Sequence, residues 1–259
     1  MRKVKGAFFS IIFMQAAAHG ATLVAPNVLG GNGNASDIYP FFIADPSESL
    51  RYQQIYSSAS FAPLYSAGGG YITQLKFRLD ETSQLLLGGT IPDIQISLST
   101  TLKAVDGLSP SFSENVGPNE LIFHPRGALV VGSAGSGTFG VALTLQTPFF
   151  YDAAPGHNLL LDVKNYQGEA LDQSPFGTLD LDAQYTLGDG VSSVDANSVG
   201  SAFGNVNTGG LITQFTYTPV PEANPSTLFG LGVIGYVLSR CRRDKNLLLK
   251  RDQKEVPCR

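Results

Sequence analysis

The feature that most constrains this chain is a repeated alternation of apolar and polar residues with a period of two. In residues 71–79 the apolar side chains, Tyr71, Leu75 and Phe77 among them, stand mainly at odd-numbered positions. Similar alternation recurs at residues 94–99, 141–146 and 211–218. Because successive side chains of a strand point to opposite faces, this pattern predicts strands with one face in a core and the other in water.

Other segments extend this all-β interpretation. Continuous apolar runs at 121–123, 128–131 and 159–163 predict strands that are at least partly covered on both faces. Residues 178–187 predict a further strand, and residues 51–61 fit an early strand or a helix. Glycine, proline and asparagine clusters separate the runs. We therefore expect an antiparallel β-sandwich, with jelly-roll-like connections, whose strand order the pattern does not reveal.

The N-terminus has a different character. Three basic residues within the first five precede an uncharged, mostly apolar run from Gly6 to Ala18, and small residues follow it. This is the layout of a secretory signal peptide, and the run is short for a membrane span. The small-x-small pattern of Ala18 and Gly20 predicts cleavage by signal peptidase between Gly20 and Ala21.

The C-terminus changes character again after Pro219. A proline-rich stretch, 219–227, leads into an uncharged, glycine-containing apolar segment that ends at a cluster of arginines. A helix over about 226–239 would be slightly short for the hydrocarbon core, and its glycines are tolerated in membrane helices. The arginines would stay on the cytoplasmic side, with residues 244–259 as a cytoplasmic tail and the body of the protein outside.

This order of segments resembles the PEP-CTERM sorting domain of Gram-negative, biofilm-forming bacteria. The resemblance covers residues 220–243, although Ala223 replaces the second proline of the motif and a sixteen-residue tail follows the arginines. It implies recognition and cleavage by exosortase, a membrane-embedded cysteine transpeptidase, and an association with extracellular polysaccharide. The residues that carry the match are Pro221, Glu222, Pro225, Ser226, Arg240, Arg242 and Arg243.

The division that follows is a signal peptide at 1–20, an ectodomain at 21–219, a sorting signal at 220–243 and a tail at 244–259. Stretches such as 51–56, 96–101 and 159–163 also resemble an ectodomain type often found before such signals, whose function is itself unassigned. Localisation is expected to be transient anchoring in the cytoplasmic membrane, followed by the cell surface or the extracellular space.

Charge narrows the classes of partner. Between Thr22 and Pro219 there are six basic and seventeen acidic residues, a net charge of −11. Such a surface repels phosphate backbones, so nucleic-acid binding is not expected. Both cysteines, Cys241 and Cys258, lie beyond Pro219, so the ectodomain cannot contain a disulfide bond.

No residue pattern predicts catalysis. His124 and His157 lack the local spacing of zinc ligands, and no serine lies in a G-x-S-x-G elbow. The G-x-G-x-x-G spacing at 135–140 opens an alternating strand, which favours a turn over a dinucleotide site. The sequence therefore predicts no enzyme and no cofactor, with a secreted hydrolase as the least favoured alternative.

A calcium site is a minor alternative. Asp180 and Asp182 alternate on the polar side of the 178–187 strand, and Asp189 and Asp195 follow in a loop. Carboxylate oxygens on loops are the ligands that calcium prefers, but the EF-hand pattern is absent.

The expected role is a structural or adhesive component of the matrix, and a carbohydrate-binding module is the alternative. The aromatic residues available as stacking platforms for sugar rings are Tyr52, Tyr56, Tyr65, Tyr151 and Tyr166, although packing in the core or a role in turns explains most of them.

Overall fold

The computed structural model describes residues 20–27, 31–41, 49–82, 89–167 and 180–220. Antiparallel strands dominate these residues, and helical structure is limited to short turns, so the predicted all-β class is confirmed. The strands are β1 (Ala21–Ala25), β2 (Ala35–Asp37), β3 (Leu50–Tyr56), β4 (Gly70–Phe77), β5 (Gly89–Thr101), β6 (Leu121–Val131), β7 (Val141–Tyr151), β8 (Asn158–Asn165), β9 (Leu181–Tyr185), β10 (Val191–Ala196), β11 (Asn205–Asn207), β12 (Gly209–Leu211) and β13 (Thr213–Pro219). The short helical elements are η1 (Ser58–Phe61), α1 (Ala62–Ser66) and η2 (Phe112–Glu114). Residues 51–61, which fitted strand or helix, contain all of β3 except its first residue, followed by η1.

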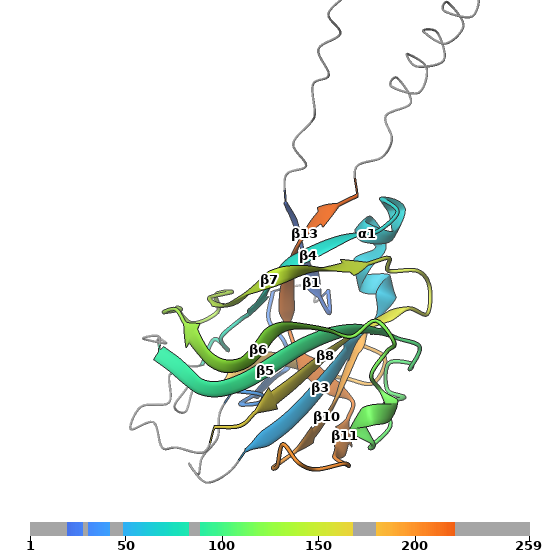
Figure 1. Cartoon of the computed structure of the whole chain (residues 1–259). Coiled ribbons are helices and arrows are strands. Elements are labelled where there is room, and N and C mark those ends of the chain that lie inside the picture. Colours follow the sequence, from blue (N-terminus) through green and yellow to red (C-terminus); the bar gives the residue numbers. More distant parts are fainter. Residues whose placement is uncertain (1–19, 28–30, 42–48, 83–88, 168–179, 221–259) are drawn as a thin grey trace, which may run out of the picture. The chain divides into compact units, whose positions relative to one another are not determined.

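Within the described residues the strands form three antiparallel sheets (Figure 1). The four-stranded sheet has the order β1-β13-β4-β7, and the six-stranded sheet has the order β11-β10-β3-β8-β5-β6. A small third sheet has the order β12-β9-β2. Most neighbouring strands are far apart in sequence, for example β1 and β13, which explains why local alternation does not encode the order.

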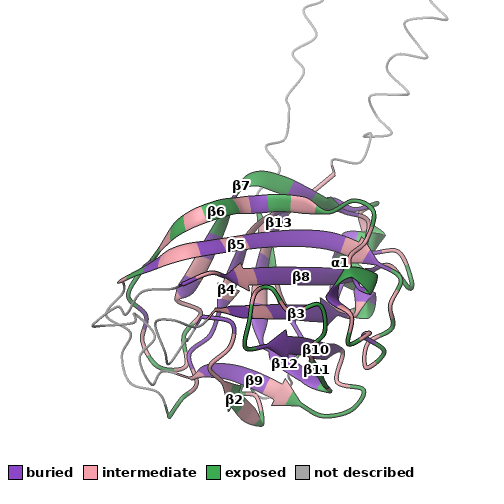
Figure 2. Cartoon of the chain, turned by 60° about the horizontal axis from the view of Figure 1, so that its bottom comes forward, coloured by how far each residue is buried: buried purple, intermediate pink, exposed green. Residues whose placement is uncertain are grey.

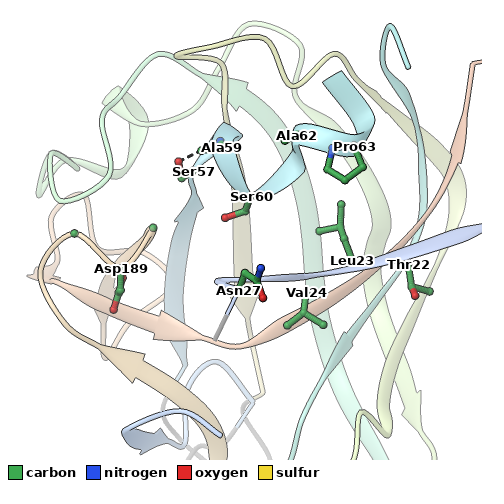
Figure 3. Close-up of a pocket in the computed structure, with 12 residues that line it drawn as sticks. Thr22, Leu23, Val24, Asn27, Ser57, Ala59, Ser60, Ala62, Pro63 and Asp189 are labelled. Atoms are coloured by element: carbon green, nitrogen blue, oxygen red, sulfur yellow. Dashed lines mark hydrogen bonds between the residues drawn. The ribbon is translucent and has the colours of Figure 1, made fainter. Parts of the chain in front are cut away.

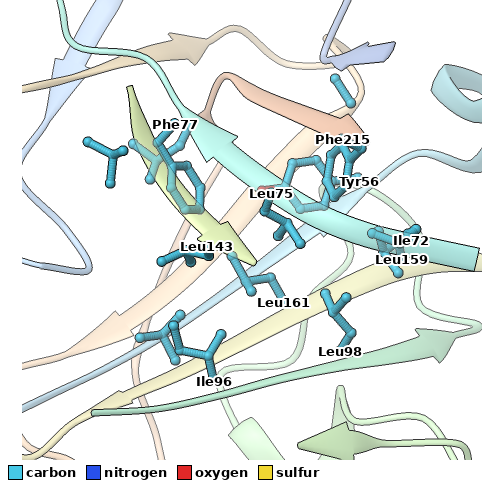
Figure 4. Packing of buried hydrophobic residues seen from close by; sticks show 14 of the residues in the cluster. Tyr56, Ile72, Leu75, Phe77, Ile96, Leu98, Leu143, Leu159, Leu161 and Phe215 are labelled. Carbon is cyan, nitrogen blue, oxygen red and sulfur yellow. The ribbon is translucent and has the colours of Figure 1, made fainter. Parts of the chain in front are cut away.

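The four-stranded and six-stranded sheets bury their inner faces in one hydrophobic cluster (Figure 4). Leu75 of β4 and Phe215 of β13 contribute from one sheet, and Leu98 of β5 and Leu161 of β8 contribute from the other. Tyr56 of β3 bridges the two, since its ring centre lies 5.0 Å from that of Phe215 in an edge-to-face contact. Such aromatic contacts add to the free energy gained by burying apolar area.

The outer face of the six-stranded sheet is covered by residues 102–120, the connection between β5 and β6, which we call the cover segment. Leu108 and Phe112 of this segment pack on Ile55 of β3, Leu160 of β8 and Val194 of β10. Strands β3, β8 and β10 are therefore buried on both faces, as Figure 2 shows. The prediction that residues 159–163 are covered on both faces is confirmed. The same prediction for residues 121–123 and 128–131 is wrong, because β6 is an edge strand with one face exposed, where Ile122 is 48 % and Val130 is 75 % exposed.

A buried polar network fastens the cover segment to the sheet. Asp162 of β8 accepts hydrogen bonds from Arg51 Nη2 at 2.9 Å and from Gln53 Nε2 at 2.8 Å. Asn115 of the cover segment donates to Gln53 Oε1 at 3.0 Å. The Arg51 guanidinium also lies 4.6 Å from the ring centre of Phe112. Each buried polar group in this network thus has a partner, as burial requires.

The outer face of the four-stranded sheet, which we call the open face, carries exposed and half-buried side chains. The pairing of β4 with β7 shifts register between Ile72 and Gln74. This bulge places Ile72 in the core and leaves Tyr71 47 % exposed on the open face. The prediction that Tyr71 lies on the core side with Leu75 is therefore wrong, because an extra residue reverses the side to which the preceding residues point.

The two ends of the described chain lie on neighbouring strands. β1 begins at Ala21, which is paired with Tyr217 of β13, and Val220 N–H donates to the carbonyl of Gly69 at 3.1 Å. No helix in the described ranges is long and apolar enough to cross a membrane. The expected signal peptide up to His19 and the expected membrane helix at 226–239 lie outside the described residues.

Candidate functional site

An aromatic pair stands out on the open face. Tyr71 of β4 and Phe150 of β7 are direct cross-strand partners, and their ring centres lie 5.4 Å apart in an edge-to-face arrangement. Tyr71 is 47 % exposed and Phe150 is 44 % exposed. A cross-strand pair has a fixed register, so both rings are held in place while much of their surface stays in contact with water.

Phe150 also lines a cleft of about 380 Å³. The cleft lies between the start of the cover segment, with Leu102, and the turn that joins β7 to β8. Leu102 is 81 % exposed at its rim. The volume falls within the range of small-molecule sites, which are mostly apolar with a few fixed polar groups. The remaining lining residues are Thr100, Pro118, Asn119, Asp152 and His157.

The polar groups of the cleft are oriented by neighbouring hydrogen bonds. His157 Nδ1 lies 2.9 Å from an oxygen of Asp152, which leaves Nε2 as the ring nitrogen that can face a ligand. The Asn119 side chain accepts from Thr100 N–H at 2.7 Å and donates to Thr100 Oγ1 at 3.0 Å. These contacts hold a carboxylate, an imidazole and an amide around one apolar floor.

The turn beneath these groups is anchored in the core. Tyr151 donates from its hydroxyl to the carbonyl of His157 at 2.6 Å. Burial, reinforced by the negative charge of Asp152, raises the pKa of Tyr151 far above its ordinary value, so the hydroxyl keeps its proton. Ala153 takes a left-handed backbone conformation, with φ of 51°, which completes the turn.

A second groove, of about 720 Å³, runs between edge strand β1 and the η1–α1 turn (Figure 3). Val24 lines one side, Ser57 and Ser60 line the other, and Asp189 lies at one end. Both oxygens of Asp189 are engaged in its own turn, by Thr186 N–H at 2.8 Å and Val191 N–H at 3.0 Å. This groove lacks an aromatic side chain, and its charged group serves the turn.

Asp180 and Asp182, two of the four carboxylates considered for a calcium site, have partners within the protein. Asp182, expected on a polar face, is only 1 % exposed and forms an ion pair with Arg78, whose Nε lies 2.6 Å from Oδ2. The expectation of a polar face was wrong because Arg78, 104 residues earlier, neutralises the buried charge. Asp180 accepts a hydrogen bond from Ser36 Oγ at 3.1 Å.

Asp195, which was expected in a loop, lies in strand β10 and is also held by neighbours. Its carboxylate accepts from Asn207 Nδ2 at 2.7 Å, and burial followed by the charge of Asp37 raises its pKa. Asp37 in turn accepts from the Tyr185 hydroxyl at 2.6 Å. Across the described ranges, no group of three or more His, Cys, Asp or Glu side chains is placed to hold a metal ion.

The aromatic residues that were available as stacking platforms differ in how far they are exposed. Tyr52, Tyr56 and Tyr151 are at most 1 % exposed, so for these three the alternative of core packing is confirmed. Tyr65 is 51 % exposed on α1. Tyr166 is covered on one side by the Arg126 guanidinium, 3.8 Å from its ring centre.

Sequence reasoning missed the Tyr71–Phe150 pair. The only local signal is the adjacent Phe149-Phe150, since in a strand one of two consecutive side chains points outward. His124 lies within β6, away from His157 in the β7–β8 turn, so the two histidines occupy different elements. The 135–140 glycine spacing forms the turn between β6 and β7, as predicted.

Of the residues predicted for processing, Gly20 and Ala21 stand at the start of β1, and the sorting-signal residues from Pro221 to Arg243 lie outside the described residues. Comparison with protein-family models, curated proteins and solved structures finds no match to this chain.

Proposed function

We propose that this chain is an exported protein, cleaved by signal peptidase after Gly20 and by exosortase near Pro221, and placed at the cell surface or in the extracellular matrix. The observation that supports it best is the position of the first and last described strands relative to the two expected cleavage points. β1 begins at Ala21, and the last backbone hydrogen bond of the described chain is made by Val220. Both expected cleavages would therefore leave every described strand intact.

The architecture proposed for the ectodomain is a β-sandwich of the jelly-roll type. Leaving out the shorter additional strands and β10, the two large sheets have the orders β1-β13-β4-β7 and β3-β8-β5-β6. Strands that follow one another along the chain mostly lie in alternate sheets. Two four-stranded antiparallel sheets connected in this way form a jelly roll.

The proposed role is structural or adhesive and not enzymatic. In the cleft lining the histidine–aspartate pair has no serine or cysteine beside it, and the one hydroxyl in that lining, Thr100 Oγ1, accepts a hydrogen bond from the Asn119 side chain. The net charge of −11 between Thr22 and Pro219 favours a soluble domain that does not bind nucleic acid.

The intact mass of the protein tests the sorting proposal. We expect a released product that starts at Ala21 and ends within residues 221–225 in a host with exosortase, and a longer membrane-bound form when the exosortase gene is deleted. Glu222→Ala should reduce release, whereas Glu114→Ala, at a side chain that is 63 % exposed on the ectodomain, should not. A membrane-bound species that retains Arg240 to Arg259 in both strains would indicate an ordinary membrane anchor.

Carbohydrate binding is the second candidate function. The specific observation in its favour is the exposed Tyr71–Phe150 pair beside a cleft with fixed polar groups. Exposed aromatic faces next to hydrogen-bonding side chains are suited to ligands with one apolar and one polar side.

A further inference from the structure

We infer that the cleft beside Phe150 binds a neutral oligosaccharide, with one sugar ring packed on the Phe150 ring and its hydroxyl groups bound by Asp152, His157 and Asn119. This inference rests on the second candidate function and is independent of the sorting signal. It assigns a site, a ligand class and a role to each residue.

The apolar half of the site comes mainly from Phe150 and Leu102. Phe150 is held from one side by the edge-to-face contact with Tyr71, which lies outside the cleft lining, so it presents a surface of fixed orientation. Leu102, which also lines the cleft, is 81 % exposed. Large exposed apolar side chains gathered at one place mark binding sites, because their exposure costs free energy that a ligand recovers. The C–H face of a sugar ring matches such a floor.

The polar half comes from residues that are already oriented. Asp152 and His157 are 42 % and 41 % exposed, so each can bind a ligand while keeping their mutual contact. The carboxylate accepts from hydroxyl groups in charge-assisted hydrogen bonds, which are stronger than neutral ones. The Asn119 amide, fixed by Thr100, can donate to a further hydroxyl. Fixed donors and acceptors lower the entropy lost on binding.

Charge selects among oligosaccharides. The ectodomain carries a net charge of −11 between Thr22 and Pro219, and the cleft itself contains Asp152. A uronic-acid polymer would bring carboxylates against this field, whereas a neutral chain would not. The covered face of the six-stranded sheet cannot serve instead, because Phe112 and Leu108 occupy it.

The test uses the full chain in a detergent without a sugar headgroup. Binding is measured by isothermal titration calorimetry with cellohexaose, maltohexaose and mannohexaose as neutral probes, and with hexagalacturonate as the anionic probe. We expect saturable binding of at least one neutral hexaose and weaker or no binding of hexagalacturonate. Phe150→Ala should weaken the neutral probe about tenfold, which corresponds to about 1.4 kcal/mol.

Two further variants separate the site from general effects. Asp152→Asn keeps the shape of the side chain and should weaken binding about fivefold, through loss of the charge-assisted bonds. Phe203→Ala removes an equally bulky side chain that is 68 % exposed elsewhere, and it should leave affinity unchanged. Circular dichroism checks that each variant folds.

The outcomes are distinguishable. Neutral binding that Phe150→Ala does not alter would keep carbohydrate binding and overturn this site. No saturable binding of any probe by the unmodified chain would overturn both, and preference for hexagalacturonate would overturn the assignment of a neutral ligand. None of these results bears on sorting, which the mass experiment tests separately.

Discussion

The two large sheets share one core on their inner faces but differ on their outer faces. On the six-stranded sheet, the outer residues Gln53 and Asp162 are polar and yet buried beneath the cover segment, and the side chain of Arg51 is only 15 % exposed. On the open face, polar residues such as Thr144 remain in water, and the aromatic residue Phe150 is exposed beside them. Residue type alone therefore does not determine which face is covered.

The difference teaches that a connection can bury a polar sheet face only if it supplies hydrogen-bond partners. The cover segment does so through Asn115 and through the backbone carbonyl of Phe112, which accepts from Gln53 Nε2 at 3.1 Å. A polar group buried without a partner would cost about 1–3 kcal/mol. The open face lacks such a cover in the described chain, which leaves it as the sheet face that a ligand can reach.

The largest effect is expected when the side chain that packs the cover segment onto the six-stranded sheet, Phe112, is removed. Phe112 is fully buried, so Phe112→Ala should lower the free energy of unfolding by about 3–5 kcal/mol. Tyr71→Ala, on the open face, should cost about 1 kcal/mol or less, since that ring is half exposed. Urea denaturation followed by circular dichroism measures both.

Hydrogen exchange supplies a second readout for the same pair of variants. Loss of Phe112 should speed amide exchange in the cover segment and leave β4 and β7 unchanged. Equal losses of stability in the two variants would mean that the outer faces do not differ in the way described here.

An intermediate effect is expected at the buried ion pair. Asp162→Asn replaces one acceptor oxygen by an N–H₂ group that meets the donors of Arg51 and Gln53, so it should cost about 2 kcal/mol. The matched control is Asp93→Asn, which alters the solvent-exposed pair of Asp93 and Arg126. That pair should contribute little to stability and lose its effect in high salt. If Asp93→Asn proved the more damaging change, burial would not explain the behaviour of the covered face.

The smallest expected effect is a pH dependence of the free energy of unfolding. It arises from the carboxyl group of Asp195, which belongs to neither outer face. The pKa of Asp195 is raised by burial and by the charge of Asp37, so the folded protein holds this proton more tightly than the unfolded chain. The free energy of unfolding should therefore fall as the pH rises from the ordinary aspartate value through the raised pKa, and stay level above it. Asp195→Asn keeps the acceptor for Asn207 and should increase stability at pH 7 by about 1 kcal/mol or less. Denaturation series between pH 4 and pH 7 measure the slope, which should become shallower in Asp195→Asn without disappearing, because burial also raises the pKa of Asp182 and of Asp189. An unchanged slope in this variant would show that Asp195 does not contribute to it.

The strands were predictable because burial of one face imposes a period of two on the sequence. Residues 94–98, 141–145 and 159–163 all lie in strands, as that pattern indicates. The bulge that turns Tyr71 outward was not predictable, since it depends on the register with β7. The partners of Asp182 and Phe150 come from distant parts of the chain, so neither the buried ion pair nor the cleft has a local signature.

The hydrogen bond from Val220 to Gly69 has a consequence for how the molecule would be presented. Gly69 also lies against Phe150: a Cβ added there would come within 2.9 Å of the aromatic ring. The chain thus leaves the folded domain next to the rim of the cleft. In the proposed membrane-anchored form, the segment that leads to the anchor would therefore begin beside the cleft, and the proposed cleavage near Pro221 would remove that neighbour from it.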